Sequence, residues 1–238
     1  MKTNLFGIML LILTITACSP METTTEVPAA ENEATVPPAE TEQALDPIEE
    51  TVVKRLAENL GLDESDISVV SNETVEFNDS CLGITMQDIK CTQVITPGRI
   101  IILEADDFQY EYHTDASGKR VQPTTLALTW KREGGIAGFC DNMMVFLSGE
   151  VYVYNCKAES DAKVDTFAKL LSASERAQFN EWMTEFDQIT LDASDPRGVS
   201  DRMEVVLEFY GLGSKEPSDI EQQAVFAWAQ DLFQKLYS

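Results

Sequence analysis

Few side chains in this sequence could do covalent or metal chemistry: there are five cysteines and a single histidine, His113. A thiol can carry a lipid, close a disulfide or bind zinc, whereas a histidine can act as a general base or a metal ligand. A nucleophilic serine or cysteine would need His113 as its base, and no serine lies in the Gly-x-Ser-x-Gly turn that presents such a nucleophile. Glycine loops of the two common phosphate-binding types are also absent from the sequence. We therefore expect a protein that is not an enzyme.

Cys18 ends the stretch Ile15-Thr16-Ala17-Cys18, which follows Lys2 and an uncharged apolar run from Leu5 to Ala17. That run is too short for a spanning helix, which needs about 20 residues, and it is typical of a secretory signal. The four residues resemble a bacterial lipobox, in which the cysteine becomes the lipidated first residue of the mature chain. The resemblance implies that residues 1–17 are a lipoprotein signal peptide. It also implies that the protein lies outside the cytoplasm, anchored to the cell membrane or outer membrane. Ordinary cleavage with an unmodified Cys18 is the alternative.

Residues 18–46 are acidic, carry no base and are rich in threonine, glutamate and proline. Large apolar side chains are almost absent, so the segment cannot bury enough surface to offset the entropy lost on ordering. We expect a disordered tether that reaches about 30 Å as a flexible coil. The whole chain has a formal charge of -24, which excludes a nucleic-acid partner and electrostatic binding to anionic lipid.

The four cysteines beyond Cys18 are expected to form two local disulfides. An even number of cysteines in an exported chain is typical of disulfides, although three pairings are possible here. Cys140 and Cys156 are equidistant from Ser148, so a hairpin that turns beside Gly149 would bring them together, and Cys81 and Cys91 would close a short loop. Zinc is the competing interpretation, but neither pair has the close spacing of a zinc knuckle and there is no second histidine. We expect no metal and no cofactor.

Residues 47–122 are predicted to form a first small domain, with one helix on an antiparallel meander. The helix runs from Pro47 to Leu60, and β-branched residues predict two short strands after it, Ile67–Val70 and Thr74–Phe77. Pro97-Gly98 predicts a turn. His113 falls on the polar face of the last strand, where a solvated or hydrogen-bonded histidine is the common case.

Residues 123–238 are predicted to form a second domain in the order three strands, helix, strand, helix. Thr125–Arg132 alternates apolar and polar residues, and a hairpin is expected to turn at Ser148-Gly149. A helix with the capping box Ser172-x-x-Glu175 is expected over Leu171–Ile189, and Asp187–Ser200 is expected to be a solvated loop. The predicted fold class is thus α+β: two small modules, each an antiparallel sheet with one or two helices, after the disordered acidic tether.

The stretch Arg132-x-Gly134-Gly135-Ile136-Ala137-Gly138-Phe139 is similar to the R-x-G-G-[FIV]-A-G opening of emfourin, a small protein inhibitor of thermolysin-like metalloproteases. The order of a helix, a strand led by Asp201 and a final helix is similar as well, over roughly Thr125–Ser238. The resemblance implies an inhibitor whose partner is a secreted metalloprotease. Cys140 and Cys156 depart from the family pattern.

Two function classes follow from the sequence. The first is a surface-tethered lipoprotein with a binding or structural role, held at the membrane by the lipid on Cys18 and presenting loops to an unidentified protein partner. The alternative is an envelope-anchored, emfourin-like inhibitor. The loops Asp79–Cys91 and Gly134–Asp141 are shaped by a disulfide or by glycines, and preorganised loops lose less entropy on binding. The candidate binding residues are Arg132, Gly134, Gly135, Ile136, Ala137, Gly138, Phe139, Met86, Gln87 and Asp88.

Overall fold

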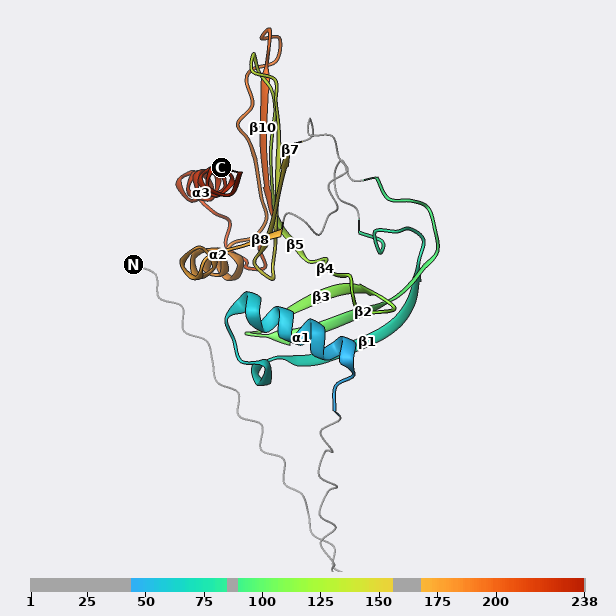
Figure 1. The fold of residues 1–238 in the computed structure, drawn as a ribbon. Coiled ribbons are helices and arrows are strands. Elements are labelled where there is room, and N and C mark those ends of the chain that lie inside the picture. The colour runs from blue at the N-terminus through green and yellow to red at the C-terminus, as the bar shows by residue number, and fades with distance from the viewer. Residues whose placement is uncertain (1–43, 85–89, 156–167, 238) are drawn as a thin grey trace, which may run out of the picture. The chain divides into compact units, whose positions relative to one another are not determined.

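Two antiparallel sheets and three α-helices make up residues 44–84, 90–155 and 168–237, which are the residues that the computed structural model describes (Figure 1). The α+β fold class expected from the sequence is confirmed. The expected signal peptide and residues 18–43 of the expected tether, Cys18 included, lie outside the described residues. No helix within the described ranges is long and apolar enough to cross a membrane.

The first sheet has the antiparallel strand order β1-β2-β3-β4. Helix α1 (Pro47–Leu60) packs on it and is followed by a short 3-10 turn, Glu64–Asp66. This is the helix-and-meander arrangement expected for residues 47–122. The strands are β1 (Ser68–Phe77), β2 (Thr96–Ala105), β3 (Phe108–Asp115) and β4 (Val121–Pro123).

The turn expected at Pro97-Gly98 is wrong, because both residues lie inside β2, opposite Glu76 and Val75 of β1. The glycine serves a close approach between strands. A Cβ at Gly98 would lie 2.1 Å from the carbonyl oxygen of Thr114 in β3, so no side chain fits there. The two short strands expected before it are a single ten-residue strand, β1, with a register shift near its start.

The first turn of α1 is fixed by Asp46, the residue before the helix. Its carboxylate accepts hydrogen bonds from the backbone N–H groups of Ile48 (2.8 Å) and Glu49 (3.1 Å), and the Glu49 carboxylate accepts one from the Asp46 N–H. Arg99 of β2 forms an ion pair with the same carboxylate, and the Asn72 amide of β1 donates to it as well. Desolvation alone would raise the pKa of Asp46, but these hydrogen bonds outweigh it and lower the pKa.

The second sheet has the antiparallel order β8-β7-β6-β5-β10-β9. The hairpin expected at Ser148-Gly149 is confirmed, since β6 and β7 pair on either side of it. Strands β8 and β9, of three and four residues, were not expected from the sequence because they are too short to show an alternating pattern. The strands are β5 (Leu126–Gly134), β6 (Phe139–Phe146), β7 (Glu150–Asn155), β8 (Ala168–Leu170), β9 (Ile189–Asp192) and β10 (Met203–Phe209).

Helices α2 (Ala173–Glu185) and α3 (Asp219–Tyr237) pack on the second sheet through aromatic side chains. The Phe179 ring lies 5.7 Å from Trp228 of α3 and 6.0 Å from Phe209 of β10, as measured between centroids. The capping box at Ser172 is confirmed, but α2 ends at Glu185 instead of continuing to Ile189. The chain after β10 closes over this helix end, where the Gly213 N–H donates to the carbonyl oxygen of Phe186 (2.8 Å).

One hydrophobic core joins both sheets, with Leu56 and Tyr112 from the first part of the chain and Trp130 and Phe179 from the second. The chain passes from one sheet to the other between β4 and β5, at the boundary expected near Pro123. Whether the two parts are separate domains stays a prediction.

Arg55 of α1 and Glu150 of β7 form a buried polar connection between the two sheets. The Nε of Arg55 donates to the Glu150 carboxylate (3.0 Å), which is only 2 % exposed, and its Nη1 donates to the Val121 carbonyl oxygen (2.6 Å). The hydroxyl of Ser148 donates to the second carboxylate oxygen (2.9 Å). Desolvation would lower the pKa of Arg55, but the Glu150 carboxylate outweighs this and raises it. Burial, followed by the charge of Glu150, raises the pKa of Tyr112.

We expect Arg55→Met to lower the free energy of unfolding by about 2 to 3 kcal/mol, because it leaves Glu150 buried without its counter-charge. The loss lies at the lower end for a buried pair because the Arg55 side chain is 31 % exposed. Urea unfolding followed by tryptophan fluorescence measures it. The matched control is Lys235→Met, which removes the exposed pair with Glu175 and should cost less than about 1 kcal/mol. Equal losses for the two variants would contradict the assignment.

Candidate functional site

The glycine-rich motif forms the turn between β5 and β6 and lies against the start of β10. Gly134 has a φ of +83°, and a Cβ at this position would lie 2.4 Å from the carbonyl oxygen of Arg202. The next N–H, of Gly135, donates to that same oxygen (3.1 Å), and the Gly138 N–H donates to the Gly135 carbonyl oxygen (2.8 Å). The motif therefore gives the turn a fixed shape and joins it to the neighbouring loop between β9 and β10.

Arg132 lies at the base of this turn and contacts side chains at the start of β6. Its guanidinium lies 3.9 Å from the centroid of the Phe139 ring and 5.6 Å from that of Trp130. Two of its nitrogens donate to the buried carboxylate of Asp141, at 3.0 and 2.6 Å. The Asp141 carboxylate also accepts a hydrogen bond from Asn155 (2.8 Å). Arg132 and Phe139 are thus bound within the protein, and their role is to hold the turn in place.

Ile136 lies at the end of the turn and is 92 % exposed, the largest value among the exposed large apolar residues of the described chain. Ala137 beside it is exposed as well. Val199, in the loop between β9 and β10, is 49 % exposed. Figure 1 shows these turns at the ends of the strands that extend beyond α2 and α3. The tip, meaning residues 135–138 and 196–200, therefore exposes Ile136, Ala137 and Val199, with Arg197 among them, on turns joined by a backbone hydrogen bond.

The sequence did not predict that Val199 belongs to the tip, because Asp187–Ser200 was expected to be a solvated loop. No local signal could have found it, because the neighbour of this loop is more than fifty residues earlier in the chain. The aspartates of this loop are used locally. Asp192 accepts a hydrogen bond from the Ser194 N–H (2.9 Å), as in a local turn, and Asp195 accepts one from the Met203 N–H at the start of β10 (2.8 Å).

The second candidate loop is closed by the disulfide Cys81–Cys91, which is confirmed. Its buried Leu82 carbonyl oxygen lies 2.6 Å from Nδ1 of His113, whose Nε2 lies 3.0 Å from the Glu111 carboxylate. His113 is thus hydrogen-bonded through both nitrogens and holds the loop on β3. Asp79, Cys81 and Cys91 are close enough for a metal ion, but the disulfide leaves no thiolate to bind one. Met86, Gln87 and Asp88 lie outside the described residues.

Only one cysteine of the second expected disulfide, Cys140, lies within the described residues. Cys140 is disulfide-bonded, but Cys156 lies outside the described residues, so the pairing of these two cysteines stays a prediction.

One hollow near Glu150 is lined entirely by described residues. The hollow between Tyr110, Thr125 and Ser148 leaves no room for a water molecule. Among the described residues, the tip is therefore the better candidate for a functional surface.

The comparisons with known proteins concern the first sheet. Residues 49–123 match the family model of a domain of unknown function (DUF8738), from the first turn of α1 to the end of β4. Comparison with curated proteins and comparison with solved structures each found no match. The second sheet and its tip lie outside the matched range.

We expect Gly134→Ala to destabilise the protein by about 3 kcal/mol, because the new methyl group would sit on a left-handed backbone and would clash with the carbonyl oxygen of Arg202. Gly198→Ala is the matched control, since Gly198 also has a positive φ (+90°) but a Cβ there would meet no other part of the described chain within 4 Å. It should cost only about 1 kcal/mol. Thermal unfolding followed by circular dichroism compares the two, and a Gly134→Ala protein as stable as the control would contradict the close approach.

Proposed function

We propose that this protein is a lipid-anchored binding protein of the cell envelope, and that it contacts a protein partner through the tip without catalysing a reaction. The observation that carries the proposal is the exposed Ile136 on a turn whose backbone is held in place. Fully burying an isoleucine side chain is worth about 1.5 to 3 kcal/mol, and a preorganised turn gains this with little loss of entropy.

Contacts at the base of the tip also support the proposal, because they hold the turn in one conformation. Arg132 is held between the Phe139 ring and the Asp141 carboxylate, so the base of the turn cannot rearrange without breaking an ion pair and a cation–π contact. Gly134 allows β10 to approach the turn, and the two loops are joined by a backbone hydrogen bond. Tips of this kind bind concave surfaces, because an apolar projection gains contacts only when a pocket surrounds it.

The lipid anchor and the tether are part of the same proposal and rest on the sequence. The lipobox-like stretch before Cys18 supports anchoring, and the acidic segment before Asp46 would separate the folded part from the lipid. The disulfide Cys81–Cys91 supports an oxidising compartment outside the cytoplasm. The acidic net charge favours a basic partner over an acidic one.

Inhibition of a thermolysin-like metalloprotease is the second candidate. The residues that resemble emfourin, Arg132 to Phe139, are the ones that build the projecting turn. A narrow convex turn is a shape that can enter an enzyme cleft. The same glycines also serve the fold, so we rank general protein binding ahead of inhibition.

The anchor is tested by Cys18→Ala. We expect the parent protein to partition into the detergent phase with the membrane fraction. The Cys18→Ala variant should appear in the aqueous phase because it cannot accept the lipid. An unchanged membrane fraction for the variant would refute the anchor.

The tip is tested by comparing Ile136→Ser with Ile220→Ser in the full chain. Ile220 lies in the first turn of α3, is 82 % exposed, and so offers the same substitution on another surface. Both variants should unfold within about 0.5 kcal/mol of the parent, because neither removes a buried contact. A photo-reactive side chain at position 136 should capture one envelope protein that position 220 does not capture, and Ile136→Ser should weaken its binding at least tenfold. Identical capture patterns from both positions would refute the tip as an interface.

Titration of the full chain in detergent against a panel of thermolysin-like proteases separates the two candidates. Inhibition that is lost in Ile136→Ser and kept in Ile220→Ser supports the inhibitor. No inhibition at a large molar excess removes that candidate and leaves general binding.

A further inference from the structure

Two tripeptides in the sequence have the form Asn-x-Ser/Thr with x other than proline, Asn72-Glu73-Thr74 and Asn78-Asp79-Ser80. This is the acceptor pattern for N-linked glycans in exported proteins, and it is used where the asparagine is accessible. The pattern is short and occurs by chance, so the surroundings of each asparagine decide whether it can serve.

The structure separates the two asparagines. Asn72 lies within β1, and its amide nitrogen donates to the Glu49 carboxylate (2.8 Å) and to the Asp46 carboxylate (3.3 Å). Asn78 lies one residue beyond β1, in a bend, and is exposed. Its side chain has no hydrogen-bond partner among the described residues. The nucleophilic amide is therefore engaged at Asn72 and accessible at Asn78.

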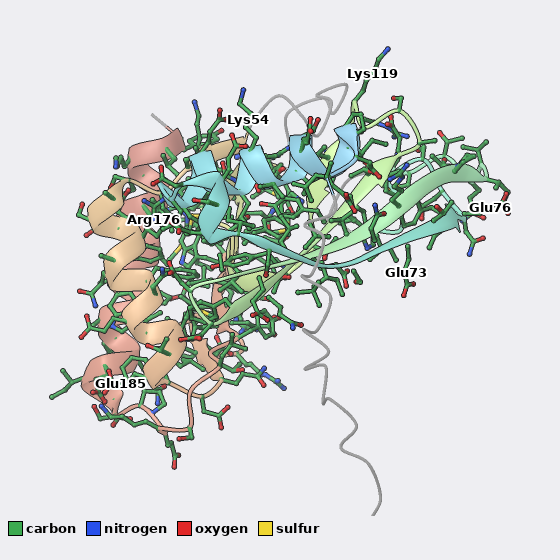
Figure 2. All side chains as sticks on the ribbon, turned by 90° about the horizontal axis from the view of Figure 1, so that it is seen from below. Lys54, Glu73, Glu76, Lys119, Arg176 and Glu185 are labelled. Atoms are coloured by element: carbon green, nitrogen blue, oxygen red, sulfur yellow. A yellow bond between two sulfur atoms is a disulfide. The ribbon has the colours of Figure 1, made fainter. Side chains whose placement is uncertain are left out.

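The residue two positions before Asn78 adds a second distinction. It is Glu76, which is exposed and points outward at the end of β1 (Figure 2), whereas Val70 stands two positions before Asn72. An acidic side chain at that position can form a charge-assisted hydrogen bond with a basic side chain of the transferase, and we expect the transferase to require it. The stretch Glu76-Phe77-Asn78-Asp79-Ser80 meets this requirement, and the stretch around Asn72 does not.

We propose that Asn78 is an N-glycosylation site that accepts an oligosaccharide from a lipid-linked donor at the outer side of the cytoplasmic membrane. The bond that forms joins Nδ2 of Asn78 to the anomeric carbon of the first sugar, and the bond that breaks joins that carbon to the lipid pyrophosphate. One amide proton passes to a base of the transferase, and the lipid pyrophosphate leaves. The proposal rests on the export that the proposed function requires.

The order of events follows from Ser80. In the folded protein its hydroxyl accepts a hydrogen bond from the Thr92 N–H (2.9 Å), and its own N–H donates to the Thr92 carbonyl oxygen (2.9 Å). Thr92 is next to Cys91, so the closed disulfide loop holds the acceptor serine in place. A transferase has to bind residues 78–80 in an extended form, and therefore transfer takes place after β1 has packed on α1 and engaged Asn72, but before Cys81–Cys91 closes.

A glycan at Asn78 would also decide between the two candidate contact loops. It would stand one residue before the Asp79–Cys91 loop and at the end of β1, which is an edge strand of the first sheet. A bulky hydrophilic chain there hinders strand pairing by another molecule and keeps partners away from that loop. The tip on the second sheet would remain available.

The test is peptide mapping of the full-length protein purified from the membranes of its own host. We expect the peptide with Asn78 to carry a glycan mass that is absent from Asn78→Gln, and the peptide with Asn72 to be unmodified. Glu76→Gln should lower the occupancy of Asn78 at least tenfold, and the double variant Cys81→Ser, Cys91→Ser should keep or raise it. A bare Asn78 in the parent protein overturns the proposal, as does a glycan on Asn72 in its place.

The same peptide mapping detects the lipopeptide that begins at Cys18. Failure of the glycan proposal can therefore be distinguished from failure of the lipid-anchor proposal. A lipidated Cys18 with a bare Asn78 overturns the glycan alone. An unlipidated N-terminal peptide overturns the anchor, and a glycan on Asn78 in that case still supports export and this inference.

Discussion

The arrangement of the two sheets depends on the ion pair between Arg55 and the buried carboxylate of Glu150. A charge removed from water is tolerated only when it is paired and hydrogen-bonded, and Glu150 meets both conditions through Arg55 and Ser148. Arg55 comes from α1, within the residues that match the family domain, whereas Glu150 lies outside them. The matched domain therefore completes its polar contacts with a group from the second sheet. The shared hydrophobic core has the same consequence, since buried side chains of both sheets belong to it.

Much of the fold could be predicted from the sequence because local signals were strong. Pro47 and Ser172 mark helix starts, and the turn at Ser148-Gly149 fixes a hairpin. Two of the failures have the same physical cause, which is that distant backbone contacts override local preference. Pro97-Gly98 was expected to turn, but β1 and β3 pair with it on both sides. Helix α2 was expected to reach Ile189, but the chain after β10 takes up its last carbonyl groups.

The candidate site was predicted in part. The motif from Gly134 to Gly138 was recognised by its composition, and its turn is indeed the projecting one. The sequence could not assign different roles to its neighbours. Ile136 and Phe139 are both apolar, yet one is exposed and the other is covered by Arg132, because the ion pair with Asp141 places the guanidinium over the ring. The contribution of Val199 depends on a long-range strand pairing that no short pattern encodes.

The contacts of Asp46 have a mechanical consequence. In the proposed lipid-anchored protein, a pull on the segment before Asp46 would reach the folded part at this residue. Here that point is hydrogen-bonded to the first turn of α1, to Asn72 of β1 and to Arg99 of β2. A force applied before Asp46 is therefore shared among a helix and two strands, and it does not simply peel the helix from its first residue. The attachment point is reinforced where load would arrive.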